Sequence, residues 1–89
     1  MTKEEITQNC IEWYVNDLNQ KLEKYGSSAR IKVEQKEDTY FIRKYYTDTK
    51  ATCTLYGTDE PTHLFNRLEA MGDGIECFFE LYIVNKYMR

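Results

Sequence analysis

The stretch from Leu64 to Tyr82 reads LFNRLEAMGDGIECFFELY. Its apolar side chains recur at spacings of 4, 3, 4, 3 and 4 residues, at Leu64, Leu68, Met71, Ile75, Phe78 and Tyr82. This pattern is typical of the buried side of a long amphipathic helix. Gly72 and Gly74 could break such a helix, but the spacing keeps its phase across them. We therefore expect one helix, or two nearly collinear ones, to about Tyr87.

A second amphipathic helix is predicted at the N-terminal end of the chain. Thr2 and Glu5 form a capping box, and the helix should run to about Tyr25 before Gly26 ends it. Its predicted buried stripe consists of Ile11, Val15, Leu18, Leu22 and Tyr25, with Tyr14 beside it and with Ile6, Cys10 and Trp13 widening it.

Between the helices the pattern has a period of two, which predicts strands over residues 30–34, 39–47 and 51–56. In the second strand both faces carry aromatic side chains. Either Tyr40, Ile42 and Tyr46 face the core, or Phe41 and Tyr45 do, and we favour the first alternative. In the third strand we expect one set of residues to point inward and the other outward: Ala51, Cys53 and Leu55 inward, Thr52, Thr54 and Tyr56 outward.

Together these elements predict one α+β domain over residues 1–89, in the order α-β-β-β-α. Short connections favour a three-stranded antiparallel meander with both helices packed on one face. The other face of the sheet should stay open to solvent. It would display Arg30, Lys32, Phe41, Arg43, Tyr45, Thr52, Thr54 and Tyr56.

Charge is distributed unevenly along the chain, which carries a net charge of −3. The helical regions hold eleven acidic and six basic side chains, a sum of −5, and residues 29–57 hold four acidic and six basic, a sum of +2. An acidic total argues against a general nucleic-acid binder, whose binding surface is usually strongly basic.

Catalytic and metal-binding motifs are not found in the sequence. Cys10, Cys53 and Cys77 are scattered singly, which favours buried, reduced thiols in a cytoplasmic protein. The single histidine, His63, is interpreted as a surface residue. No apolar run approaches the length of a membrane span. We therefore expect no enzyme activity, no cofactor, no metal and no membrane association.

Two surfaces are candidates for binding a partner. The first is acidic and comprises Glu60, Glu69, Asp73, Glu76 and Glu80, which could imitate the charge of DNA toward a basic protein surface. The second lies on the sheet and comprises Phe41, Arg43, Tyr45 and Tyr56, a mixture suited to a protein contact or to nucleic acid. The long apolar seam of the last helix also allows a homodimer.

The element order resembles that of double-stranded-RNA-binding domains. That family places a lysine-rich stretch at the start of its second helix, whereas Thr58, Asp59 and Glu60 stand there in this chain. The resemblance is therefore one of topology.

The stretch from Leu55 to Tyr82, LYGTDEPTHLFNRLEAMGDGIECFFELY, resembles small phage and mobile-element proteins of Firmicutes, a minority of which are anti-CRISPR inhibitors. This resemblance implies an inhibitor of a nucleic-acid-handling host complex, such as a CRISPR effector nuclease. The hypothesis from sequence is thus a non-enzymatic, cytoplasmic protein-binding module that acts by acidic charge complementarity. The alternative is a small RNA- or DNA-binding domain that uses the basic, Tyr-rich sheet face.

Overall fold

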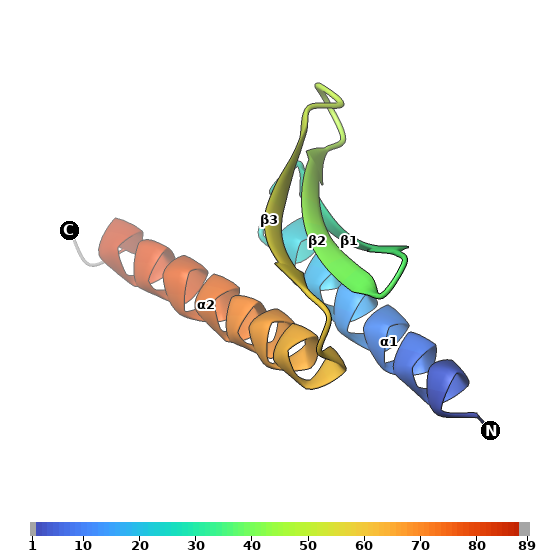
Figure 1. Ribbon diagram of the computed structural model, residues 1–89. Coiled ribbons are helices and arrows are strands. Elements are labelled where there is room, and N and C mark those ends of the chain that lie inside the picture. Colours follow the sequence, from blue (N-terminus) through green and yellow to red (C-terminus); the bar gives the residue numbers. More distant parts are fainter. Residues whose placement is uncertain (1, 88–89) are drawn as a thin grey trace.

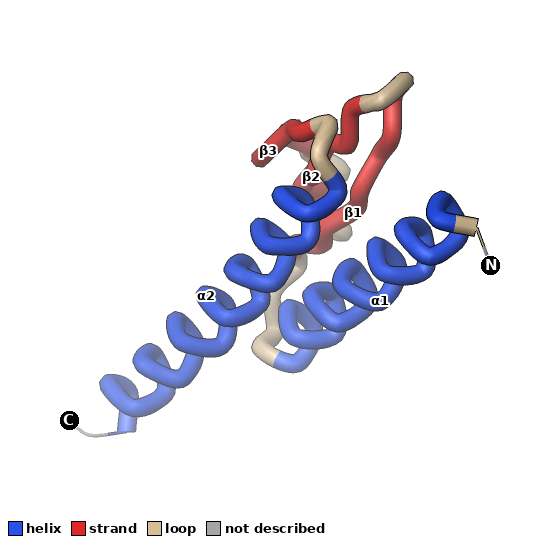
Figure 2. Tube along the Cα trace, turned by 60° about the horizontal axis from the view of Figure 1, so that its bottom comes forward, coloured by secondary structure: helices blue, strands red, loops and turns tan. Residues whose placement is uncertain are grey.

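The computed structural model describes the backbone of residues 2–87 and the side chains of residues 2–76. Five elements follow one another in the predicted order: α1 (Lys3–Lys24), β1 (Ala29–Lys36), β2 (Thr39–Tyr46), β3 (Thr52–Thr58) and α2 (Pro61–Tyr87). The strands form an antiparallel meander with β2 in the centre. Both helices lie on one side of this sheet (Figures 1 and 2), so the predicted fold class is confirmed.

Local chemistry explains where α1 begins and ends. The Thr2 hydroxyl accepts a hydrogen bond from the backbone N–H of Glu5 at 3.1 Å, which satisfies one of the free donors of the first turn. At the other end Gly26 adopts a φ of +79°, the left-handed conformation in which glycine avoids the steric penalty of a side chain. The predicted limits of this helix are therefore confirmed to within about one residue.

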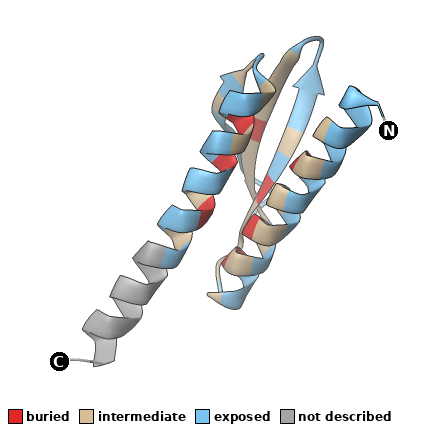
Figure 3. Cartoon of the chain, turned by 90° about the horizontal axis from the view of Figure 1, so that it is seen from below, coloured by how far each residue is buried: buried red, intermediate tan, exposed pale blue. Residues whose placement is uncertain are grey.

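The core lies between the sheet and the two helices (Figure 3). Its buried side chains come from every element except β3: Ile11, Leu18, Leu22, Ile31, Ile42, Leu64 and Leu68. Partly buried residues pack around them, among them Tyr40, Val33 and Tyr56. Burial of Ile42 with Tyr40 packed beside it confirms the favoured orientation of β2.

The third strand departs from the prediction because its pairing with β2 shifts at one point. Ile42 pairs with Tyr56, but the next residue, Arg43, pairs with Thr54, so Leu55 is an extra residue on β3. Such a β-bulge reverses the alternation on one side of it. Tyr56 therefore packs against the core and Leu55 is 45% exposed, the reverse of the orientation predicted for both.

Cys53 was also predicted to face inward and be buried, but it is exposed. It pairs with Lys44 near the end of the β2–β3 hairpin, which projects beyond the helices (Figure 1). Cys10 is only partly buried. The expectation of buried thiols is thus wrong for Cys53 and only partly met by Cys10, and Cys77 lies outside the described side chains.

Asn19 fastens α1 to the outer edge of β1. Its side-chain amide donates to the Ile31 carbonyl at 3.0 Å, and its Oδ1 accepts from the Ile31 N–H at 2.8 Å. One amide therefore satisfies both backbone groups that Ile31 would offer to a further strand. This contact blocks the edge of the sheet at the point where the core reaches it.

α2 runs without interruption through both glycines, as the phase of its seam predicts. At Gly72 a methyl group would lie 3.2 Å from Lys21 Nζ and 3.6 Å from Leu18 Cδ2. Gly72 therefore permits close approach of the two helices. At Gly74 no described atom would lie within 4 Å of such a group.

We predict that Asn19→Ala lowers the free energy of unfolding by about 1–3 kcal/mol, because it leaves an N–H and a carbonyl of β1 without partners. Urea denaturation measures the change. Asn16→Ala, at an exposed position of the same helix, is the matched control and should change stability by less. Equal effects at the two positions would show that the Asn19 bonds do not hold β1.

We further predict that Gly74→Ala raises the free energy of unfolding by up to about 1 kcal/mol, because alanine restricts the unfolded chain and favours the helix. Gly72→Ala should gain less, since its methyl group would have to displace the Lys21 ammonium. Denaturant midpoints of the two variants test this order. A larger gain at Gly72 than at Gly74 contradicts the close approach of the helices.

Candidate partner-binding surfaces

The two helices lie side by side and run in the same direction (Figure 2). Residues that come later in α1 contact residues that come later in α2. Tyr14 stacks on Phe65, Gly72 faces Leu18 and Lys21, and Lys21 reaches Glu76. This parallel arrangement brings acidic positions of α1 and α2 to the same outer groove.

Carboxylates from both helices line this groove. Glu69, Asp73 and Glu76 follow at spacings of 4 and 3, which puts them on one side of α2. A hollow of about 210 Å³ between the helices is lined by Trp13, Tyr14, Asp17, Lys21, Leu68, Glu69, Gly72 and Asp73. We call these eight residues, together with Glu76, the interhelix groove.

Trp13 stands at the rim of the interhelix groove and is 64% exposed. The sequence predicted that it widens the buried stripe of α1, and this is wrong. The same prediction is also wrong for Ile6, which is 50% exposed. The sheet is only three strands wide, so it covers the Ile11–Leu18–Leu22 line of α1 and leaves the flank beyond it in solvent.

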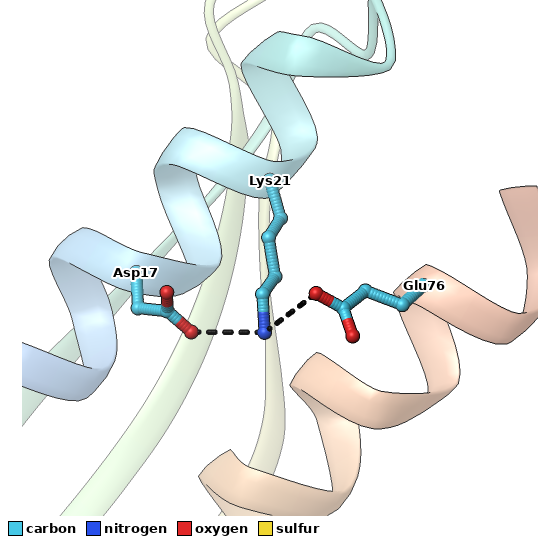
Figure 4. A network of polar contacts seen from close by, with 3 residues as sticks. All are labelled: Asp17, Lys21 and Glu76. Atoms are coloured by element: carbon cyan, nitrogen blue, oxygen red, sulfur yellow. Dashed lines mark ion pairs between the residues drawn. The ribbon is translucent and has the colours of Figure 1, made fainter.

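Lys21 closes one end of the groove by joining the two helices (Figure 4). Its Nζ lies 3.0 Å from Asp17 Oδ2 on its own helix and 3.3 Å from Glu76 Oε1 on α2. The hydrogen bond with Asp17, assisted by that with Glu76, raises the pKa of Lys21 above its ordinary value of 10.5, because both carboxylates favour the charged ammonium.

The predicted acidic residues do not all meet at this groove. Glu69 and Asp73 line the hollow, and Glu76 borders it through Lys21. Glu60 immediately precedes α2, roughly 13 Å along the helix axis from Glu69. The side chain of Glu80 lies outside the described residues. Asp17 was not among the predicted binding residues, because the periodicity of one helix does not show which of its polar positions will face another.

The back of the sheet, as far as the structure describes the chain, is covered by no element. Strand register sets its side chains in three cross-strand rows: Glu34–Phe41–Gly57, Lys32–Arg43–Thr54 and Arg30–Tyr45–Thr52. The Phe41 ring lies against Gly57, where a methyl group would be only 3.1 Å from it. Phe41, Arg43 and Tyr45 are thus brought together as predicted.

Contacts within the sheet already engage most of its basic groups. Glu34 pairs with Lys32 at 3.1 Å and with Arg43 at 3.7 Å, and Lys32 Nζ lies 5.6 Å from the centre of the Tyr45 ring. The Arg30 guanidinium donates to two backbone carbonyls at 2.7 Å. Glu34 thus offsets part of the positive charge of this face, and the two carbonyls occupy donors of Arg30 that could otherwise bind a phosphate.

Tyr56 does not belong to the back of the sheet, which corrects its predicted place in that surface. The bulge at Leu55 turns it toward the helices, where the Arg67 guanidinium carbon lies 4.3 Å from the centre of its ring. This cation–π contact ties β3 to α2. The predicted sheet surface therefore reduces to Phe41, Arg43 and Tyr45.

Among the residues whose side chains are described, the histidine and the two cysteines lie on three different elements: Cys10 on α1, Cys53 on β3 and His63 on α2. His63 is exposed on α2, as the sequence indicates. Among the described residues no group of three histidine, cysteine, aspartate or glutamate side chains is placed to hold a metal ion. Within the same residues, neither helix has the combination of length and apolar composition needed to cross a bilayer.

Comparison of the chain with models of protein families, with curated proteins and with solved structures gave no match.

We predict that Lys21→Met lowers the free energy of unfolding by up to about 1 kcal/mol, the usual range for a partly exposed ion pair. The loss should shrink as salt screens the repulsion left among Asp17, Glu76 and their neighbours. Lys24→Met is the control, because Lys24 is exposed and forms no ion pair with another described residue. Equal losses at both positions contradict a bridging role for Lys21.

The pH dependence of this contribution follows from the raised pKa of Lys21. A raised pKa in the folded state stabilises the protein fully below the ordinary value of 10.5, and the stabilisation is lost as pH rises through the folded value. The stability difference between the natural chain and Lys21→Met should therefore be constant near neutrality and vanish in that alkaline range.

Proposed function

We propose that this protein is a non-enzymatic binding module that docks on a basic surface of another protein through the interhelix groove. The observation that carries this proposal is the placement of an exposed tryptophan beside carboxylates from two helices. Aromatic residues are enriched at the centres of protein interfaces, and complementary charge steers the encounter.

The class of partner follows from the charge of the groove and from the resemblance to mobile-element proteins. A surface that normally binds nucleic acid is basic, and carboxylates arranged along a rigid helix can occupy it in place of phosphates. The partner proposed is accordingly a nucleic-acid-handling host complex, with a CRISPR effector nuclease as the specific case. In that setting the protein would act as an inhibitor and a DNA mimic in the cytoplasm.

The alternative function, RNA or DNA binding through the back of the sheet, is the second choice. It is favoured by the uncovered Tyr45 and Phe41 rings among basic residues, which could stack on bases. It is opposed by the internal pairing of Lys32 and Arg43 with Glu34 and by the acidic charge of the whole chain.

The test compares two charge-reversed variants of the same net charge. Glu69→Lys with Asp73→Lys changes the groove, whereas Glu12→Lys with Glu23→Lys changes exposed positions elsewhere on α1. Affinity for purified CRISPR effector complexes is measured by surface plasmon resonance across a salt series. We expect binding that weakens as salt rises and that falls about tenfold or more in the groove variant only.

Two results would contradict the proposal. One is an equal loss of affinity in both variants, which would mean that net charge and not the groove matters. The other is the absence of any protein complex together with binding of a labelled oligonucleotide at low salt. If Lys32→Glu with Arg43→Glu then abolished oligonucleotide binding, the back of the sheet would be the functional surface.

A further inference from the structure

The surroundings of Trp13, rather than its exposure alone, point to a particular ligand. Single exposed apolar side chains are common on protein surfaces and need no explanation. Trp13 differs because it is held in place and because its neighbours are charged. It is also the only tryptophan of the chain.

A ladder of three aromatic rings fixes Trp13 at the rim. Its ring meets Tyr14 edge to face, with centroids 5.1 Å apart and planes at 83°. Tyr14 in turn stacks on Phe65 of α2, with centroids 5.8 Å apart and planes at 23°. The ladder reaches from one helix to the other, so the tryptophan is positioned by the same packing that sets the groove.

The carboxylates beside this ladder are unequally neutralised. Lys21 pairs with Asp17 and Glu76 at one end of the groove. Glu69 and Asp73 line the same hollow as Trp13, but neither forms an ion pair with any residue whose side chain is described. An aromatic rim and two unneutralised carboxylates thus face one hollow.

We propose that this hollow receives an arginine side chain of the partner protein. This inference rests on the proposed function and identifies the partner side chain that anchors the complex. A guanidinium is planar, so it can stack on the indole of Trp13 while its N–H groups donate to Glu69 and Asp73. A lysine ammonium offers a point charge and no plane to stack. The hollow of about 210 Å³ is smaller than most small-molecule pockets and suits one long side chain.

Intrinsic fluorescence of Trp13 provides a direct test, because no other tryptophan contributes to the signal. The protein is titrated with three nonapeptides composed of arginine, of lysine and of citrulline, the neutral analogue of arginine. We expect a saturating change with the arginine peptide, weaker binding of the lysine peptide by about two- to fivefold, and no change with citrulline. Equal binding of the arginine and lysine peptides would overturn the proposal.

Substitutions in the groove test where the peptide binds. Affinities are measured by calorimetry, because the substitution of Trp13 removes the fluorescence signal. Glu69→Gln with Asp73→Asn should weaken arginine-peptide binding about tenfold, whereas the matched pair Glu12→Gln with Glu23→Gln should not. Trp13→Ala should weaken it about two- to fivefold, and Trp13→Phe should retain part of the affinity. Circular dichroism checks that each variant folds. Undiminished binding by Trp13→Ala would contradict stacking.

Failure of this inference can be told apart from failure of the proposed function. If Trp13→Ala leaves binding of a CRISPR effector complex unchanged while the lysine substitutions at Glu69 and Asp73 abolish it, docking by charge stands and the arginine anchor is wrong. If arginine peptides bind as expected but no effector complex binds, the anchor stands and the proposed partner class is wrong.

Discussion

The width of the sheet is the constraint on which the rest of the structure depends. Three strands span two interstrand spacings, roughly 10 Å, and two packed helices lie about 8–10 Å apart. Both helices therefore fit on one face only if each helix packs one narrow row of side chains against the sheet. The adjacent row of each helix then packs against the other helix. Leu18, Leu64 and Leu68, each at most 1% exposed, occupy that shared line against Ile42. Described side chains farther around the helices, such as Trp13 and Glu69, remain exposed, and the groove lies between them.

Parallel packing of the helices decides what the groove contains. Because Lys21 of α1 lies opposite Gly72 and Glu76, the exposed acidic side of α2 is brought beside Asp17 of α1. The same packing fixes Trp13 through Tyr14 and Phe65. On the far side of the molecule, Glu34 neutralises part of the basic character of the sheet. Glu69 and Asp73 on the helical side form no ion pair with a described side chain, and this difference between the faces supports the proposed binding role of the groove.

Sequence periodicity predicted the elements well, because the spacing of apolar residues reflects which side of a single helix or strand is buried. It gave the order of elements, the continuity of α2 through its glycines and the inward orientation of Ile42. It failed where pairing between elements decides the outcome. The bulge at Leu55 arises from the register of β3 against β2, and it exchanged the orientations of Leu55 and Tyr56. Trp13, Asp17 and Asn19 acquire their roles from neighbours on other elements or from the limited width of the sheet. The spacing of residues along α1 carries no information about either.

The most direct test of this account is a set of nuclear Overhauser contacts measured by NMR on the protein in solution. We expect contacts between the helices in ascending order, from Tyr14 to Phe65 and then from Leu18 to Gly72, together with contacts from Leu64 and Leu68 to Ile42. No contact should join either helix to Phe41 or Tyr45 on the back of the sheet. Contacts in descending order, or contacts from α2 to Tyr45, would contradict the shared face and the groove that depends on it.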